Sequence, residues 1–354
     1  MTPRLLLAAA LLLPAVTAAL AGGPHPSLPP PAVPECMGVN IHFTTPQPGE
    51  LEMLAAAGFR WVRMDFGWAR TETTLAATTS RPTTAFVAHL GKHQLRAVFV
   101  LDYGNPLYAD PGDKFPFTSR AGTPEFRAAF ARWAAAAVRH FAGRGYLWEM
   151  WNEPDANHWK PQPDAADYAA LAKATGQALR EAAPGEAFMG PGLAKVNLRF
   201  LETCFQAGLL EYWDAVTVHP YRHTDPELVA PEYQALQQLI AKYAPPGKTI
   251  PVVASEWGYC SAWAGFDEER QAKMFAREIT TNLAHGVPLT IWYDWRDDGP
   301  QGKPTDDHFG LVTHEYHPGR TPPFDPKPVY FAVKEFVEKM RRLPPTTPAP
   351  KPQP

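Results

Sequence analysis

The stretch YLWEMWNEPD, residues 146–155, is an apolar and aromatic run that ends in the polar step Asn-Glu-Pro. Its length and composition predict a buried strand that stops where the polar residues begin. Asn, Pro and Asp are also ordinary turn residues, so a strand end that simply reaches solvent is the alternative. Glu153 needs an explanation in either case, because a carboxylate taken out of water costs free energy unless it is paired or neutralised.

Seven other apolar runs of similar length occur along the chain. They are CMGVNIHF (36–43), RWVRMDF (60–66), RAVFVLDY (96–103), AFMGPGLA (187–194), DAVTVHPY (214–221), IPVVASEW (250–257) and PLTIWYDW (288–295). Runs with helical spacing separate them, including residues 49–58, 124–143, 164–184 and 267–286. Several of these begin with acidic residues and end at Gly or Pro, as helices do.

This alternation predicts an α/β protein with a parallel sheet. A count of eight strands matches a closed (β/α)8 TIM barrel in one domain, which we place at residues 35–342. The chain has no G-x-G-x-x-G after its first strand and no G-x-x-x-x-G-K-[ST] segment, so dinucleotide and phosphate-loop folds lose their main support.

The composition permits a large core, with 45% hydrophobic and 19% charged residues. The formal charge of −3 gives no sign of nucleic-acid or anionic-membrane binding. Eleven Trp, twelve Tyr and nineteen Phe provide many flat rings, which suit the apolar faces of sugars and also suit an ordinary core.

Both ends of the chain differ from the predicted barrel. Residues 1–21 combine one Arg, an apolar run interrupted by Pro14 and the pattern Ala-Leu-Ala, which predicts a cleaved signal peptide and a secreted or periplasmic protein; an anchor helix is the alternative. Residues 22–34 are a proline-rich lead-in and residues 343–354 a proline-rich tail, both expected to be extended and solvated. The chain has three cysteines, Cys36, Cys204 and Cys260. Their spacing is not that of a metal site, and an odd number allows at most one disulfide among them.

The carboxyl ends of barrel strands meet on one face, where the chemistry of such barrels lies. The polar and aromatic residues at the predicted strand ends are His42, Arg63, Asp65, Asp102, Tyr103, Asn152, Glu153, His219, Tyr221, Glu256, Trp292, Asp294 and Trp295. Two of them, Glu153 and Glu256, are glutamates that follow apolar strands. One such carboxyl can protonate a leaving oxygen while the other, ionised, attacks carbon, which is the arrangement of glycoside hydrolysis.

The WNEP motif at residues 151–154 and the SEWG motif at residues 255–258 resemble the clan of retaining glycoside hydrolases on (β/α)8 barrels, including families 5 and 39. The resemblance covers nearly all of residues 36–340. It implies that Glu153 is the acid/base and Glu256 the nucleophile.

The same resemblance implies roles for other strand-end residues. Asn152 would hydrogen-bond the sugar 2-hydroxyl or the nucleophile-bound sugar, and Arg63 would hold the nucleophile ionised. His219 and Tyr221, at the end of the sixth predicted strand, would line the site. Trp292, at the end of the eighth, would form the floor of the sugar subsite. Trp295 and His42 are further candidates for substrate contact. We expect low polarity around Glu153 to keep it protonated, and a nearby cation to favour ionised Glu256.

Several residues keep two interpretations at this stage. Trp159, Trp257, Trp263 and Trp295 are sugar platforms or packing, and His42 contacts substrate or caps the rim. Asp294, Asp297, Asp298, Asp306, Asp307 and His308 lie in a stretch that fits a cation site or, as we expect, a solvated acidic loop. Asp102 and Tyr103 belong to no motif and are expected to be structural.

The leading hypothesis is a secreted, monomeric, cofactor-free and metal-free retaining glycoside hydrolase that cleaves β-glycosidic bonds of a polysaccharide or oligosaccharide, acting within chains. Two alternatives from the same fold are an exo-acting β-glycosidase or β-xylosidase and an inactive barrel that only binds glycans. A metal-dependent barrel hydrolase would need clustered ligands, for which His42, His219 and His308 are a poor match.

Overall fold

The computed structural model describes residues 28–78, 81–109, 112, 114, 123–299 and 307–343, with the side chains of residues 81 and 82 excepted. The predicted signal peptide, residues 22–27 of the lead-in, Asp306 and residues 344–354 of the tail lie outside the described residues.

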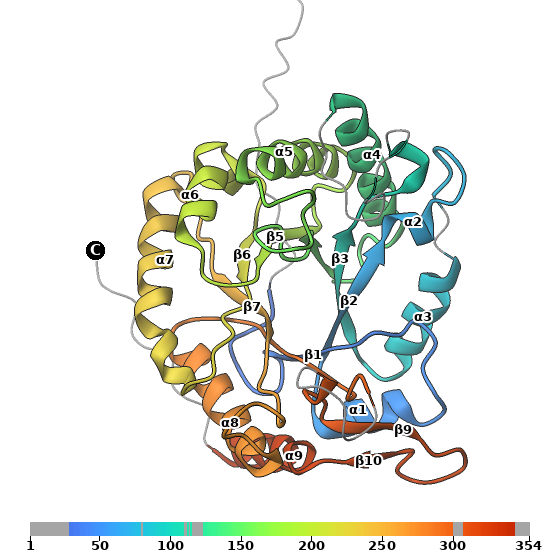
Figure 1. Cartoon of the computed structure of the whole chain (residues 1–354), viewed down its shortest axis with the longest axis vertical. Helices are drawn as coiled ribbons and strands as arrows, with labels where there is room; N and C mark the ends of the chain where they lie inside the picture. Colours follow the sequence, from blue (N-terminus) through green and yellow to red (C-terminus); the bar gives the residue numbers. More distant parts are fainter. Residues whose placement is uncertain are drawn as a thin grey trace, which may run out of the picture.

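Eight parallel strands close into a barrel in sequence order, as predicted (Figure 1). The strands are β1 (Met37–Asn40), β2 (Trp61–Gly67), β3 (Arg96–Asp102), β4 (Leu147–Met150), β5 (Ala187–Leu193), β6 (Ala215–Val218), β7 (Val252–Trp257) and β8 (Thr290–Trp292). The ring closes through pairing of β1 with β8, in which Val39 lies opposite Trp292. A short antiparallel hairpin of β9 (Val312–Tyr316) and β10 (Phe324–Pro326) follows the barrel; the sequence analysis did not anticipate it.

Helices surround the barrel in a ring (Figure 1). The α-helices are α1 (Glu50–Ala57), α2 (Trp68–Thr71), α3 (Arg81–Lys92), α4 (Pro124–His140), α5 (Ala165–Ala182), α6 (Leu198–Gln206), α7 (Ala230–Tyr243), α8 (Glu268–Ala284) and α9 (Pro328–Arg342). Within the described residues there are also three short 3-10 helices: η1 (Pro106–Tyr108), η2 (Leu209–Glu211) and η3 (Pro226–Val229). The four helices predicted by residue range correspond to α1, α4, α5 and α8.

Local sequence signals set where these helices begin. The Thr123 hydroxyl accepts a hydrogen bond from the backbone N–H of Phe126, and Pro124 occupies the first turn of α4. Asp164 caps α5 and Asp267 caps α8 in the same way. Each cap satisfies backbone donors that the first helical turn leaves free.

Alternation along the strands divides the core into two layers. Side chains that point into the barrel form one cluster, and those that point outward pack beneath the helices. The interior cluster comprises Trp61, Val98, Leu147, Ala187, Met189, Ala215, Val253, Leu289 and Ile291. It is filled so tightly that a Cβ on Gly38 would lie 2.3 Å from Ile291 Cδ1. The barrel is therefore a packed core, and its chemistry must lie beyond this layer.

The described part of the lead-in differs from the expectation of a solvated segment. Leu28 packs against the interior cluster and Val33 against the outer core. The apolar residues between the prolines explain this, since they give the segment something to bury. Cys36, Cys204 and Cys260 are all buried, and none of them forms a disulfide. Within the described ranges, no helix has the length and hydropathy needed to cross a membrane.

Candidate active site

Strand alternation places Arg63 and Glu149 above the packed interior. Trp61 and Leu147 point into the barrel, so the residue two positions later on each strand points the same way. On β2 that residue is Arg63, and on β4 it is Glu149. Both side chains are buried and meet at 2.7 Å between Arg63 Nε and Glu149 Oε2.

Two departures from regular strand geometry bring the predicted glutamates to the same place. The chain leaves β4 through Trp151 at φ 67° and Glu153 at φ 48°, and the Glu153 backbone N–H donates to Gly192 O at 2.8 Å. Left-handed backbone at non-glycine residues is costly and gathers at functional sites. On β7 the register with β8 shifts between Ala254 and Trp257, which turns the strand around Glu256.

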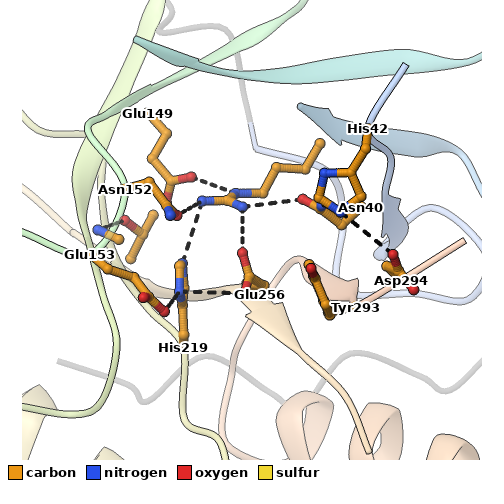
Figure 2. Close-up of polar contacts among 12 residues, drawn as sticks. Asn40, His42, Glu149, Asn152, Glu153, His219, Glu256, Tyr293 and Asp294 are labelled. Atoms are coloured by element: carbon orange, nitrogen blue, oxygen red, sulfur yellow. Dashed lines mark hydrogen bonds and ion pairs between the residues drawn. The ribbon is translucent and has the colours of Figure 1, made fainter. Parts of the chain in front are cut away.

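Arg63 joins the members of the polar network that results; its partners Asn40, Glu149, Asn152, His219 and Glu256 are labelled in Figure 2. Its Nη1 donates to Glu256 Oε2 at 2.7 Å and to Asn40 Oδ1 at 3.2 Å. Its Nη2 donates to Asn152 Oδ1 at 2.8 Å and lies 3.5 Å from His219 Nε2. The planar guanidinium thus joins residues from β1, β4, β7 and the segments after β4 and β6, which a lysine could not do.

Glu256 is held at both oxygens. Oε2 accepts from Arg63, and Oε1 accepts from the Tyr221 hydroxyl at 2.9 Å. Burial and the Glu256 charge raise the pKa of Tyr221 well above its ordinary value, so Tyr221 remains a hydrogen-bond donor. The carboxylate is therefore fixed in direction while its edge still reaches the cleft.

Glu153 has polar neighbours, and the expectation of a low-polarity environment is wrong. His219 Nδ1 lies 3.0 Å from Oε1, and His158 Nδ1 lies 3.4 Å from Oε2. Burial alone would raise the pKa of Glu153, but the hydrogen bonds and charges of His158 and His219 outweigh it and lower the pKa below its ordinary range. The reason is that Glu153 stands beyond the end of β4, between two imidazoles, and not within the apolar strand.

His219 lies between the two glutamates. Its Nδ1 is 3.0 Å from Glu153 and 3.9 Å from Glu256 Oε1. Since Arg63 can only donate, the nitrogen facing it must accept, and neutral His219 therefore carries its proton on Nδ1. Burial lowers the pKa of His219, but the charge of Glu256 and the contact with Glu153 outweigh it and raise the pKa. One oxygen of each glutamate and one nitrogen of His219 all lie within 4.8 Å of one another.

A second group of side chains lies on the β1 and β8 side of the site (Figure 2). The half-exposed His42 ring has Nε2 at 3.3 Å from Asn40 Nδ2 and 3.5 Å from Asp294 Oδ2. Tyr293 packs edge-on against His42 and Tyr221, with centroids 5.6 and 6.4 Å apart. Burial raises the pKa of Asp294 to about 7, although His42 lowers it. Through Asn40, this group is connected to Arg63.

The two tryptophans predicted at strand eight are both buried, although Trp295 lines a cavity beside His42 and Asp294. Trp292 is fully buried beneath α8, with its ring 5.3 Å from Phe275. Trp295 is buried, donates from Nε1 to Glu50 Oε1 at 3.0 Å and packs on Tyr330. Ile291 points into the barrel, so strand alternation sends Trp292 outward and brings Tyr293 to the cleft.

The other predicted residues fall into two sets. Asn152, Glu153, His219, Tyr221, Glu256, Arg63 and His42 are brought together by the contacts given above. Of the remaining tryptophans, Trp159 and Trp257 are fully buried and serve packing, whereas Trp263 is partly exposed and stacks on His223 with centroids 4.1 Å apart. Asp102 is fully buried, and burial together with Asp65 raises its pKa well above the ordinary value.

Four residues of the network were not predicted: Asn40, Glu149, His158 and Tyr293. Glu149 carried a signal, because a charged residue in the middle of an apolar strand needs a buried partner. Tyr293 could have been found from strand phase once Ile291 was placed inside. His158 lies in the segment after the WNEP motif, where no periodicity applies.

The expectation of a solvated acidic loop after β8 is wrong for three of its residues. Asp294, Asp297 and His308 are buried, and Asp297 Oδ1 accepts from the buried Lys327 at 2.8 Å. Asp298 is exposed as expected. The acidic residues that are buried have partners in the hairpin region or in His42, which the sequence analysis did not foresee.

Two groups of described residues have ligand atoms close enough for a metal ion. They are Glu153, His219 and Glu256, and His42, Asp294 and Asp298. In the first group the Arg63 cation already occupies a carboxylate at 2.7 Å, which opposes a second cation there. The expected absence of a metal and of a cofactor stays a prediction.

The fold is similar to those of several solved glycoside hydrolases. A family 39 glycoside hydrolase from Bacteroides cellulosilyticus WH2 aligns with a TM-score of 0.72 at 23% identity, over 89% of this chain and 64% of that one. A monomeric β-xylosidase from Caulobacter crescentus CB15 aligns with a TM-score of 0.66 at 18% identity, over 84% of this chain and 67% of that one. Xylanase 10B from Thermotoga petrophila RKU-1 aligns with a TM-score of 0.60 at 17% identity, over 86% and 94%.

These similarities show a shared (β/α)8 fold. This chain spans less than two thirds of the length of the Bacteroides enzyme. No protein-family model matches the chain, and no curated protein matches it. The function must therefore be argued from the residues at the carboxyl ends of the strands.

Proposed function

We propose that the protein is a retaining β-glycosidase that uses Glu256 as nucleophile and Glu153 as acid/base. The observation that supports this most strongly is the pair of carboxylates on either side of His219, with oxygens within 4.8 Å of each other. Carboxyl groups stand about 5–5.5 Å apart in retaining enzymes and about 6.5–9.5 Å apart in inverting ones, which need room for a water molecule. The spacing in this site favours direct attack by a carboxylate.

In the first step a Glu256 oxygen would form a bond to the anomeric carbon while the glycosidic C–O bond breaks. Arg63 and Tyr221 hold Glu256 in the direction of attack. The leaving oxygen takes a proton from Glu153. His219 Nδ1–H donates to one Glu153 oxygen, which leaves the other oxygen to carry that proton. Because His158 and His219 lower the pKa of Glu153, the protonated form that this step requires is favoured at low pH.

In the second step water would add to the anomeric carbon of the glycosyl-enzyme. Glu153 accepts the proton of this water, the bond to Glu256 breaks, and the sugar leaves with its original configuration. Because this step needs a base, the flanking histidines that favour ionised Glu153 assist it. Asn152 stands between Arg63 and His158 and is our candidate for the sugar 2-hydroxyl.

We further propose that the substrate is a polysaccharide or oligosaccharide outside the cytoplasm, cleaved within the chain by a monomeric enzyme. The export prediction rests on residues 1–21. The prediction of endo action rests on a compact barrel sequence without obvious insertions. A panel of polysaccharides separates the alternatives: a ladder of products supports endo action, and a single monosaccharide from chain ends supports exo action.

Azide rescue of two variants tests the roles of the glutamates. Glu256→Gly leaves space on the far side of the sugar, so azide should attack an activated glycosyl fluoride directly and give an inverted product. Glu153→Ala should still form the glycosyl-enzyme from a substrate with a good leaving group, and azide should release it with retained configuration.

NMR of the two glycosyl azides and of the wild-type product gives the result. Opposite configurations from the two variants, with retention by the wild type, support the assignment. The same configuration from both variants, or inversion by the wild type, would contradict it. A wild type that binds glycans without turnover would instead support the inactive binding barrel.

A further inference from the structure

Glu149 is a third carboxylate in the site, one more than the two-glutamate mechanism uses. It is fully buried, so no substrate oxygen can reach it. Its Oε2 accepts from Arg63 Nε at 2.7 Å. Its Oε1 lies against the backbone of β5, where a Cβ added to Gly192 would come within 3.1 Å of it. The carboxylate is therefore enclosed between Arg63 and the β5 backbone.

Glu149 is ionised despite its burial. Burial raises its pKa, but the charges of Arg63 and His219 and the hydrogen bond from Arg63 outweigh this and lower the pKa. A buried ionised glutamate with one cationic partner is a poor choice for stability alone, because apolar residues often serve as well. Its presence at this point therefore suggests a functional reason.

Charge balance supplies such a reason. Arg63 carries one positive charge and contacts two carboxylates at 2.7 Å each, Glu149 and Glu256. The three groups together carry one net negative charge. If Arg63 contacted Glu256 alone, the pair would be neutral. The full positive charge of Arg63 would then act on the carboxylate that has to attack the sugar.

We propose that Glu149 is a positioning residue that holds the Nε edge of Arg63 and shares its charge, so that Glu256 is oriented without being fully neutralised. The net negative site then favours the positive charge that develops on the sugar ring in the oxocarbenium-like transition state. The proposal rests on the proposed function. On this proposal, Glu149 affects the reaction rate without contacting the substrate.

The geometry of the guanidinium requires such a partner. Nη1 and Nη2 are directed at Glu256, Asn40, Asn152 and His219, and only Nε is left for an anchor outside the cleft. Glu149 anchors that edge from within the barrel. Without Glu149 the Arg63 guanidinium is free to tilt and to displace Glu256. A small displacement of a catalytic group lowers the reaction rate strongly.

The test compares Glu149→Gln, Glu149→Asp and the control Glu278→Gln. Glu278 is a fully buried glutamate on α8, outside the barrel, and neither of its oxygens has a hydrogen-bond partner in the described structure. The readouts are kcat, KM and the pH–rate profile on an aryl β-glycoside with a good leaving group, beside melting temperature. The aryl glycoside is chosen from a panel as the one that the wild type cleaves.

Glu149→Gln should lower kcat roughly 10- to 100-fold, in the range of a displaced catalytic group, with KM close to wild type. Removal of a negative charge beside Arg63 should also move the acidic limb of the profile to lower pH. Glu149→Asp keeps the charge and should restore the position of that limb, even if kcat stays reduced. Glu278→Gln should keep both kcat and the profile.

A folded Glu149→Gln variant with wild-type kcat and an unmoved acidic limb would overturn the proposal and leave Glu149 a structural ion pair. If Glu149→Gln does not fold, Glu149→Asp decides alone: a moved limb with the charge retained contradicts the proposal, and an unmoved limb with lowered kcat supports it. Failure of the proposed function is distinguishable, because the wild type itself would then be inactive or inverting.

Discussion

Replacement of Arg63 by Met should reverse the sign of the pH dependence that Glu149 contributes to the free energy of unfolding. The side chain is buried and is the cationic partner of both Glu149 and Glu256. Methionine has a similar length and no charge, so the space stays filled while the charge is removed. Glu149 is then left fully buried with no cation in contact.

The expected loss follows from the cost of leaving a buried charge unpaired, about 3–5 kcal/mol. At about 2 °C per kcal/mol for a large domain, the melting temperature should fall by roughly 6–10 °C near neutral pH. Arg277→Met is a matched control, because Arg277 is part-exposed and pairs with the exposed carboxylates of Asp225 and Glu227. Surface pairs of this kind are worth about 0–1 kcal/mol.

The sign with pH comes from Glu149. In the wild type its folded pKa is lowered, so its contribution to stability is present above the unfolded pKa and is lost as pH falls through the folded value. In Arg63→Met the burial term remains without the cation, and the folded pKa should rise above the unfolded one. The contribution then disappears as pH rises through that raised value. The deficit of the variant should therefore widen from pH 5 to pH 8.

Melting curves at four pH values between 5 and 8 measure this for the wild type, Arg63→Met, and the double variant Arg63→Met with Glu149→Gln. The double variant should lose the widening with pH, because the titrating carboxyl is gone. A deficit that stays constant with pH in Arg63→Met, or one that persists unchanged in the double variant, would refute the account of the Arg63–Glu149 pair.

Four further substitutions have expected outcomes. Lys327→Met should cost about 3–5 kcal/mol in unfolding titrations, since Lys327 and Asp297 are both buried and paired at 2.8 Å; a cost below about 1 kcal/mol would show that the pair is solvated. Burial raises the folded pKa of Glu278, so the contribution of Glu278 to the stability of the wild type is lost as pH rises. The melting temperature of Glu278→Gln should therefore exceed that of the wild type by more at pH 8 than at pH 5. A gap between the two proteins that stays constant from pH 5 to 8 would contradict this. Tyr293→Ala should reduce kcat/KM while Trp295→Phe should lower only stability, and the reverse result would restore the tryptophan to the site.

Much of the fold could be predicted because its signals are local. Apolar runs of strand length and capped helical runs alternate, and each is read from residues close together in sequence. Glu153 and Glu256 could be found for a related reason: parallel strands end on one face, so their last polar residues must converge.

The remaining parts of the site depend on contacts that sequence separation hides. Glu149 meets Arg63 across 86 positions, and the apolar strand around it gives no hint of which cation it pairs with. Trp292 and Tyr293 are neighbours, and only the placement of Ile291 inside the barrel decides which of the two reaches the cleft. His158 approaches Glu153 through an irregular segment, so the polarity around the acid/base could not be inferred from β4 alone.

The covalent intermediate is the central claim, and its capture tests that claim most directly. The protein is incubated with a panel of 2-deoxy-2-fluoro-β-glycosides bearing dinitrophenolate leaving groups, digested and analysed by tandem mass spectrometry. The account predicts that one sugar of the panel becomes attached to Glu256 in the peptide containing SEWG, with loss of activity in step with labelling. A label on Glu153, or turnover of a panel member by an inverting route with no label at all, would contradict it.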